Sequence, residues 1–501
     1  MKIAGLDIGT TGCKCTVFDE QGRYLNKAYK DYPVRRSVSG HEVDVSTIMD
    51  GVYAVVAEMA KEYPDIAGIG VTSFGETFVM TDENGKPLHT AMLYTDPRGE
   101  EECKALTEKF GTRELAGITG LRAHQMYSIP KMMWIKKNRP EIYDAAAYIF
   151  LMEDYVVYHL TGKRQIDYSL ATRTMAFDIK KLDWSKEIFE VAGIDVNKMS
   201  KTVPTGTDAG VITAEAAEKT GLAPSTHIVS ISHDQVSAAI GAGAFDSSVA
   251  VDGAGTVECV TPIYDSIPDI DAMYDGYFSI VPYVIPGKYV AYAFSYTGGA
   301  LIQWCVDNLA KDEKRAAAAD RDLSVNEYLE KKYATERGEE NPSNLLILPH
   351  FAGAATPYMD TGSKGAILGL TTDTTVADIY RGCMEGVVYE MLVNTSALKK
   401  SGCKFKKLNA TGGGARSGEW MQMKADMLNV PITALKTVDA GTVGSAMLTG
   451  IATGVFKDLN DAAEHMVEET VEYLPRKEMH EKYMHIFERY AKVYQAVRPL
   501  V

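Results

Sequence analysis

The chain has 501 residues, of which 46% are hydrophobic, and a formal net charge of −15. A single core rarely grows beyond about 250–300 residues, so this length predicts two domains or more. The acidic balance argues against nucleic acid or an anionic membrane surface as a partner, because both attract a basic surface.

The cysteine content and the N-terminal residues predict a cytoplasmic location. The chain contains seven cysteines, an odd number, and no CxxC pair, which predicts free thiols rather than disulfides. Asp7 interrupts the first apolar run too early for a signal peptide. No stretch approaches the ~18 uninterrupted apolar residues of a membrane helix, so no membrane partner is expected.

The first half of the chain begins with a predicted hairpin, residues 3–8 and 13–18, around the stretch "LDIGTTGCKCTVFD". A further strand pair is expected around 22–29, and helical spacing predicts a helix over 46–62 capped by Ser46. The runs "IAGIGVTS" (66–73) and "AMLYTD" (91–96) are predicted strands, and 128–160 is predicted to be mostly helical, with Pro140 in a first turn. The buried strand "HIVSISHD" (227–234) ends on Asp234.

The second half repeats this plan. Residues 247–262 again form strand, Gly-Thr turn and strand, and a helix is expected after Gly298-Gly299. Further predictions are a long helix over about 375–400, a strand, glycine turn and helix over 408–428, and a small-residue helix over 439–456. The repetition predicts an internal duplication with domains at 1–245 and 246–501, and a ligand cleft between them.

The two Gly-Thr turns are candidate phosphate sites. Glycine lets the backbone approach a ligand closely, and the hydroxyl of Thr10 or Thr256 adds a donor. Lys14 can neutralise phosphate charge, and Asp7 can hold Mg²⁺ together with waters and phosphates. The alternative is an ordinary tight hairpin turn. Neither a P-loop nor a G-x-G-x-x-G fingerprint occurs in the chain.

Three further positions carry candidate chemistry. Asp234 at a strand end can accept a hydroxyl proton during phosphoryl transfer, or can cap the next helix, or both. Glu76 in "SFGET" can accept hydrogen bonds from a polyol, the alternative being a solvated loop glutamate. The glycine turn at 412–414 suits a base or ribose platform. His233-Asp234 lacks the further His/Asp cluster of a metal phosphohydrolase.

These motifs resemble those of the FGGY carbohydrate kinases, in the same order and over nearly the whole chain. "MYSIPKMMWIKKN" (126–138) is similar to the first family signature. "GAILGLTTDTTVADIYRGCMEG" (365–386) is similar to the second, except at Gly382 and Cys383. The resemblance implies an α/β fold, with two RNase H-like domains of the actin/Hsp70/sugar kinase fold and an interdomain cleft.

The resemblance also implies roles for individual residues. Asp234 matches the catalytic base, and Asp7 and Asp234 are the positions near Mg²⁺. The positions that match nucleotide contacts are Thr10, Thr11, Lys14, Thr256, Gly299, Gln303, Gly413, Gly414 and Ser417. The positions near the acceptor are Phe74, Gly75, Glu76, Asp96 and Gln235, with Arg98 in the same "YTDPR" block as Asp96.

The acceptor positions do not follow one member of the family. Xylulose kinases carry a Gln-Met-His-Gly block where this chain has residues 73–76, and glycerol kinases carry Arg-Glu where it has Gly75-Glu76. Gln235 matches the residue that follows the base in glycerol kinases, but Met126 stands where they have a glycerol-binding tyrosine. The segment 153–174 is instead similar to the corresponding segment of xylulose kinases. Glycine in place of arginine is expected to open room for an acceptor longer than glycerol.

The resemblance therefore implies an ATP- and Mg²⁺-dependent kinase that phosphorylates a primary hydroxyl of a ketose or polyol, with a pentulose such as xylulose favoured. The alternatives are a glycerol or tetritol kinase, an actin/Hsp70-like ATPase acting on protein partners, and a non-catalytic sugar-binding homologue. Dimers are common in the family, so a homodimer is a candidate assembly.

Overall fold

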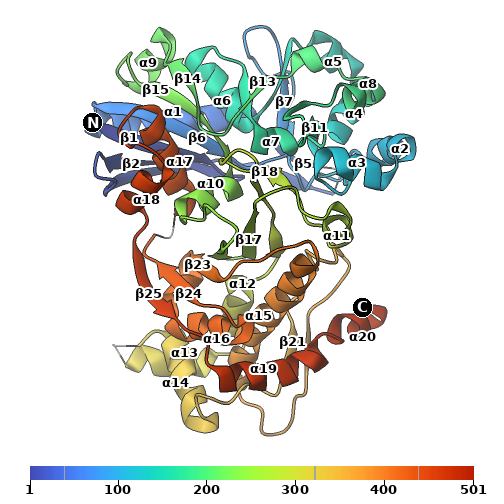
Figure 1. Ribbon diagram of the computed structural model, residues 1–501, viewed down its shortest axis with the longest axis vertical. Coiled ribbons are helices and arrows are strands. Elements are labelled where there is room, and N and C mark those ends of the chain that lie inside the picture. Colours follow the sequence, from blue (N-terminus) through green and yellow to red (C-terminus); the bar gives the residue numbers. More distant parts are fainter. Residues whose placement is uncertain (39, 321–322, 438) are drawn as a thin grey trace.

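The computed structural model describes residues 1–38, 40–320, 323–437 and 439–501. Figure 1 shows two α/β halves along the longest axis, the first from blue to green and the second from yellow-green to red. None of the helices within these ranges is long and apolar enough to cross a membrane.

The first half is built on a six-stranded sheet with the order β14-β15-β6-β1-β2-β3. Its strands are β1 (Lys2–Ile8), β2 (Gly12–Asp19), β3 (Tyr24–Asp31), β6 (Ile66–Ser73), β14 (Thr207–Val211) and β15 (His227–His233). Strands β1, β6 and β15 run parallel, and β2, β3 and β14 are antiparallel to their neighbours. The three parallel strands are apolar and buried almost throughout, because helices and the second half cover both faces of the sheet.

The helices of the first half lie around this sheet. They are α1 (Val45–Glu62), α2 (Glu100–Phe110), α3 (Thr112–Thr119), α4 (Ser128–Asn138), α5 (Pro140–Ala145), α6 (Met152–Thr161), α7 (Tyr168–Thr172), α8 (Lys186–Ala192), α9 (Ala214–Thr220) and α10 (Asp234–Gly241). Short strand pairs complete this half, among them β4 (Val34–Ser37) with β5 (Gly40–Val43) and β7 (Phe78–Thr81) with β9 (Tyr148–Leu151).

The second half repeats the strand plan of the first. Its main strands are β16 (Val249–Ala254), β17 (Glu258–Tyr264), β23 (Lys407–Thr411), β24 (Ile432–Leu435) and β25 (Glu469–Tyr473). The order β17-β16-β23-β24-β25 has the same sequence of antiparallel and parallel pairings as β2-β1-β6-β15-β14. The shared topology is the structural counterpart of the repeat seen in the sequence.

The helices of the second half include the longest of those described. They are α11 (Ile270–Asp275), α12 (Gly299–Asn308), α13 (Lys311–Ala319), α14 (Val325–Arg337), α15 (Val376–Lys400), α16 (Gly418–Leu428), α17 (Ala440–Ala452), α18 (Leu459–Met466), α19 (Lys477–Tyr490) and α20 (Val493–Val497).

Helices α10 and α17 join the halves. Although α17 follows β24 in the chain, it packs on β1 and β6 of the first sheet and crosses α10, which Figure 1 shows as red beside blue and green. Glycines make this crossing possible: a Cβ on Gly241 would overlap the carbonyl oxygen of Ala440, and one on Gly444 would overlap that of Ser237. Ser445 Oγ also donates to Gly70 O at 2.8 Å.

Several local expectations need correction. Asp44, not Ser46, caps α1, since its carboxylate accepts from the Ser46 backbone N–H at 2.9 Å. The strand expected over 91–96 shortens to β8 (Ala91–Met92). Residues 128–160 are mostly helical, as predicted, with β9 between α5 and α6. Strand β15 ends at His233, so Asp234 is the first residue of α10 and not its cap.

Candidate active site

The first Gly-Thr turn, residues 9–12, joins β1 to β2 and places an acid opposite a base. Asp7 and Lys14 are paired across the two strands, and Lys14 Nζ lies 3.0 Å from Asp7 Oδ2. The same ammonium lies 2.9 Å from Asp439 Oδ1, at the start of α17. Lys14 therefore links the first turn to a carboxylate from the second half of the chain.

Burial raises the pKa of Asp7 to about 6, because a charged carboxylate is poorly solvated there. Lys14 opposes this shift, while Asp234 and Asp439 add to it through negative charge. Burial by itself would lower the pKa of Lys14, but Asp7 and Asp439 raise it above its ordinary value. The site thus concentrates three carboxylates around one lysine, leaving negative charge that a cation can neutralise.

Asp234 lies in the first turn of α10, directly after the end of β15. Its Oδ1 is buried without a hydrogen-bond partner in the described part of the chain. His233 Nε2 lies 3.2 Å from that oxygen, but burial and Arg173 lower the pKa of this imidazole to about 3, so it is neutral. Burial raises the pKa of Asp234 to about 6, and its interaction with Gln235 opposes the rise. The carboxylate is therefore close to its ionisation threshold at neutral pH and has one oxygen free to accept a proton.

Glu76 is buried and forms an ion pair with an arginine that the sequence analysis did not identify. Arg173 Nε donates to Glu76 Oε1 at 2.7 Å, and its Nη2 donates to the same oxygen. The guanidinium also stacks 5.2 Å from the centre of the Tyr127 ring. Glu76 has a φ of 64°, a left-handed conformation that is uncommon for a residue with a side chain. The alternative of a solvated loop glutamate is thus wrong, because this residue is only 4% exposed.

The room expected beside Gly75 is already filled. A Cβ on Gly75 would lie 2.9 Å from Arg173 Cγ and 3.1 Å from His233 Cδ2. The expectation that glycine opens space for a longer acceptor is therefore wrong in this conformation. Arg173, which follows α7, occupies the space and pairs with the neighbouring Glu76.

The other predicted acceptor positions differ in how free their side chains are. Both oxygens of Asp96 accept from Arg98, at 2.8 and 2.6 Å, and one also accepts from the His41 N–H. Burial would raise the pKa of Asp96, but these bonds hold it below its ordinary value. Phe74 is buried at the end of β6, where its N–H donates to Ile8 O. Asp96 is thus engaged in structural contacts, whereas Gln235 lies beside the carboxylate of Asp234.

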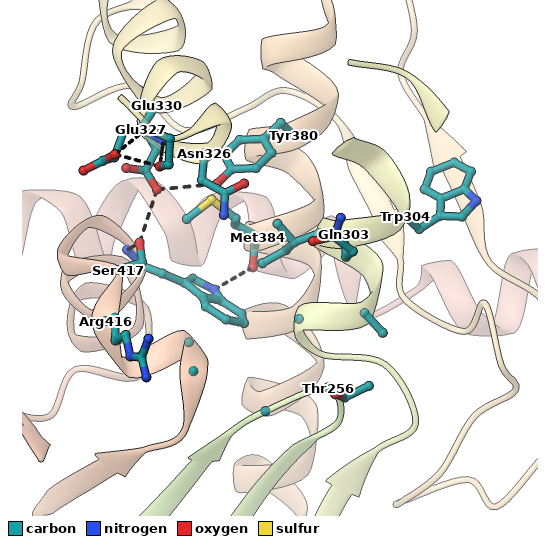
Figure 2. A pocket seen from close by; sticks show the side chains of 18 of the residues that line it. Thr256, Gln303, Trp304, Asn326, Glu327, Glu330, Tyr380, Met384, Arg416 and Ser417 are labelled. Carbon is teal, nitrogen blue, oxygen red and sulfur yellow. Dashed lines mark hydrogen bonds between the residues drawn. The ribbon is translucent and has the colours of Figure 1, made fainter. Parts of the chain in front are cut away.

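A cavity of about 1150 Å³ lies in the second half, next to the second Gly-Thr turn, residues 255–257. Many of the predicted nucleotide positions line it: Thr256, Gly299, Gln303, Gly413, Gly414 and Ser417. The remaining predicted nucleotide positions, Thr10, Thr11 and Lys14, belong to the first turn and are not part of this lining. Figure 2 shows Thr256 at one end of the cavity and α14 side chains at the other.

Glycines hold the second turn against a helix N-terminus. The N–H groups of Gly298 and Gly299 donate to Thr256 O and Gly255 O, both at 2.9 Å. A Cβ on Gly299 would lie 2.9 Å from Gly255 O, so no larger residue fits without movement. The turn therefore sits at the start of α12 and accepts from its first N–H groups, and the positive end of the helix dipole there favours an anion.

Sequence reasoning missed the far wall of this cavity. Glu330 and Asn326 from α14, Tyr380 from α15 and Trp420 from α16 line it. Glu330 and Asn326 belong to no motif, whereas Tyr380 lies in the second family signature and Trp420 in the glycine-turn segment 408–428, where neither had an assigned role. Only tertiary packing brings these side chains to the cavity. Arg173 and Asp439 were missed for the same reason, since only tertiary contacts bring them to Glu76 and Lys14.

Comparison with known proteins agrees with this arrangement. Residues 2–241 match the N-terminal domain of the FGGY family of carbohydrate kinases, and residues 254–453 match its C-terminal domain. A xylulose kinase of Lactococcus lactis is 25% identical over 98% of this chain and 96% of its own length. A gluconokinase of Bacillus subtilis is 28% identical over 96% of this chain and 93% of its own length.

Solved structures agree on the fold. The crystal structure of a ligand-bound xylulose kinase from Lactobacillus acidophilus has a TM-score of 0.88, with 24% identity over 99% of this chain and 98% of that one. The predicted α/β fold, with two RNase H-like domains of the actin/Hsp70/sugar kinase fold, is confirmed. Because both domain models of the family match in order, the chain belongs to the FGGY family of carbohydrate kinases, phosphotransferases that act on a sugar hydroxyl group.

Proposed function

We propose that this kinase transfers the γ-phosphoryl group of ATP to a primary hydroxyl of a ketose or polyol, with a pentulose such as xylulose as the favoured acceptor. The observation that carries the proposal is the buried, unpartnered Oδ1 of Asp234. The positive charges of Arg173 and Lys14 favour the ionised form of Asp234 and lower its pKa, against the effect of burial. A carboxylate placed in this way can remove the proton of an acceptor hydroxyl.

The chemistry divides between the two halves of the chain. The acceptor oxygen attacks the γ-phosphorus, the bond to the bridging β–γ oxygen breaks, and ADP leaves with that electron pair. Asp234 takes the hydroxyl proton, while Lys14 and the Thr256 turn at the start of α12 stabilise phosphate charge. Positioning and charge stabilisation provide most of the catalysis in this class of reaction.

The acidic residues fit a magnesium ion. Mg²⁺ usually binds one or two carboxylates together with phosphates and waters, so it does not need a cluster of protein ligands. Within the described ranges there is no group of three His, Cys, Asp or Glu that could hold a metal. Asp7 and Asp234 would hold the ion, and their mutual repulsion, which raises the pKa of Asp7, is what a cation would relieve. Bound there, Mg²⁺ would neutralise phosphate charge.

The pair formed by Glu76 and Arg173 is the proposed acceptor-recognition group. Both hydrogen bonds from the Arg173 guanidinium end on Glu76 Oε1, and no hydrogen bond to Glu76 Oε2 is found in the described ranges. Oε2 can therefore accept from a sugar hydroxyl. The preference for a pentulose is supported by the similarity to xylulose kinases and no longer by free room beside Gly75. Glu76 and Gln235 match the residues that glycerol kinases have at these positions. Glycerol or a tetritol is therefore the second candidate for the acceptor.

The test is a panel of acceptors assayed by ADP release with purified protein. We expect the highest kcat/KM for a pentulose, lower values for gluconate, erythritol and glycerol, and the loss of most of this activity in Asp234→Asn. Preference for glycerol or gluconate would contradict the pentulose assignment. Sugar-independent ATP hydrolysis would instead support an ATPase, and acceptor binding without turnover would support a sugar-binding homologue.

The acceptor site has its own variant. Glu76→Ala removes a charge-assisted acceptor and leaves sugar hydroxyls unpaired, at about 1–3 kcal/mol each. We expect kcat/KM for the acceptor to fall by roughly 10- to 100-fold, while the KM for ATP stays within about threefold. Unchanged kcat/KM for every acceptor would mean that the sugar binds elsewhere.

A further inference from the structure

Asp439 occupies the N-cap position of α17 without capping that helix. Aspartate is common at this position because its carboxylate accepts a hydrogen bond from the second or third N–H of the helix. Asp458 does this for α18, where its Oδ1 accepts from the N–H groups of Asn460 and Asp461, both at 3.0 Å. Asp439 makes no such bond, and its Oδ1 lies 2.9 Å from Lys14 Nζ on β2. The carboxylate is therefore engaged with the first half of the chain rather than with its own helix.

The start of α17 is held in place by contacts with the first half. Helix α17 packs on β1, and a Cβ on Gly441 would lie 3.4 Å from Asp7 Oδ2. Ser237 Oγ of α10 donates to Gly441 O at 2.7 Å, which ties the first turn of α17 to the helix that begins with Asp234. The carboxylate of Asp439 thus extends from a fixed point that is close to the proposed base.

Lys14 has one N–H left after its two carboxylate contacts. A lysine ammonium has three N–H donors. Asp7 Oδ2 and Asp439 Oδ1 lie 3.0 and 2.9 Å from Nζ, and no other hydrogen bond from Nζ is found in the described ranges. The lysine side chain is 28% exposed, so a ligand can reach it. Two carboxylates, one from each half, therefore hold a flexible side chain and leave one donor for a phosphate oxygen.

We infer that Asp439 is a positioning residue for phosphoryl transfer, which holds Lys14 so that its remaining N–H binds the phosphoryl group as it is transferred. The inference rests on the proposed function, in which Lys14 stabilises phosphate charge. In this role Asp439 touches neither ATP nor the acceptor, and it acts through Lys14 alone.

This role has a kinetic signature that a merely structural contact lacks. A carboxylate repels the phosphates of ATP, so Asp439 does not tighten the binding of ATP in the ground state. A lysine that is already fixed needs no reorientation when charge shifts in the transition state, so the benefit of fixing it appears in kcat. Loss of Asp439 should therefore lower kcat and leave the KM for ATP unchanged or lower.

The test is a double-mutant cycle in the whole chain, assayed by ADP release with the acceptor that gives the highest kcat/KM. The proteins are the wild type, Asp439→Ala, Lys14→Met and the double variant. We expect Asp439→Ala to lower kcat by about 3- to 30-fold, within the usual range of coupling between contacting residues. In the Lys14→Met background the same substitution should change kcat by less than about twofold, since its effect passes through the lysine.

Two further variants separate positioning from folding. Asp458→Ala removes a carboxylate that does cap its helix, so it should lower the melting temperature and leave kcat unchanged. Asp439→Ala removes no cap, so its melting temperature should fall less than that of Asp458→Ala. Asp439→Asn keeps an oxygen that can accept from Lys14 and should retain more of kcat than the alanine variant. It also takes the place of Asp439→Ala in the cycle if that variant does not fold.

Additive effects of the two substitutions would overturn the inference, because Asp439 would then act independently of Lys14. Unchanged kcat in Asp439→Ala would overturn it as well, and a lower KM for ATP in that case would mean that Asp439 only competes with phosphate for the lysine. Either result in a protein whose wild type releases ADP with an acceptor refutes only the role of Asp439. A wild type without acceptor-dependent ADP release would refute the proposed function itself, and the inference with it.

Discussion

The two Gly-Thr turns have the same strand plan but treat their charged residues in opposite ways. In the first half, Asp7 and Lys14 remain 14% and 28% exposed, and the lysine bridges to Asp439. In the second half, Asp252 on β16 is bound by Lys424 from α16, and both side chains are 0% exposed. The acid–lysine pair of the first turn is thus accessible to a ligand, whereas that of the second is sealed.

Glu258 joins Asp252 and Lys424 in this buried group, which we call the sealed cluster. Lys424 Nζ lies 2.7 Å from Asp252 Oδ2 and 2.5 Å from Glu258 Oε1. Burial and the charge of Asp252 raise the pKa of Glu258 well above its ordinary value, against the charge of Lys424. The comparison teaches that one duplicated plan holds a partly exposed ionic site in one half and a fully buried one in the other.

The largest expected effect is on turnover, from a substitution of Asp234 in the first half. Asp234→Asn removes the proton acceptor while keeping the shape of the side chain, so kcat should fall by roughly 10²- to 10⁴-fold. ADP affinity, measured by calorimetry, should change little. The melting temperature at pH 7 should be equal or higher, because the pKa of Asp234, raised to about 6, means that its ionised form is disfavoured in the folded state. Turnover within threefold of the wild type would remove Asp234 from the mechanism.

The sealed cluster should respond through stability instead. Lys424→Met leaves the buried Asp252 carboxylate without its partner, and breaking such a pair typically costs about 3–5 kcal/mol. Denaturant unfolding should therefore show a large loss, with a smaller effect on the KM for ATP of the folded fraction. Unfolding at the wild-type denaturant concentration would show that this cluster is dispensable.

Lys14→Met is the matched variant in the first half. It makes the same chemical change at a lysine that is partly exposed, so the loss of stability should be smaller than that caused by Lys424→Met. Removal of a charge that faces phosphate should instead reduce kcat/KM for ATP by roughly 10- to 100-fold. If the two lysine variants gave the same pattern, the contrast between the turns would be wrong.

The pH dependence follows from the raised pKa values of the first half. Asp7 and Asp234 both have a pKa of about 6, so each is protonated as the pH falls through that value. Activity needs the ionised base, and kcat should drop by about tenfold per pH unit below about 6. In the folded state these groups hold protons between pH 3.8 and about 6 that the unfolded chain releases, so the stability they contribute decreases as the pH rises through this window. Flat kcat between pH 5 and 7 would contradict this.

The smallest effect concerns the second turn. Thr256→Val removes one hydroxyl donor and keeps the shape, so the KM for ATP should rise by about 3- to 10-fold, as expected for a single neutral hydrogen bond. The KM for the sugar should stay unchanged, because the residue lines the cavity in the second half. Thr10→Val should have a similar effect if both turns contact one nucleotide, and an effect of only one variant would assign the phosphates to that turn.

Local patterns in the sequence were sufficient for the elements around each turn. The apolar runs at 3–8, 66–73 and 227–234 predicted β1, β6 and β15, because strands buried on both faces are continuously apolar. Small residues over 439–456 predicted a closely packed helix, and α17 does cross α10 through glycines. The strand expected over 91–96 ends at Met92 because the chain then turns, with the Asp96 N–H donating to Leu93 O, and the Asp96 carboxylate binds Arg98.

The sequence by itself determined the repeated strand–turn–strand plan, the family, and the candidate residues on motifs, since these depend on periodicity and on short spacing. Only the tertiary structure decided which charges are accessible and which side chains complete the site. Arg173 fills the space beside Gly75, Asp439 reaches Lys14, and Glu330 lines the cavity because distant segments pack together. Burial and charge pairing depend on neighbours in space, and no local pattern records those neighbours.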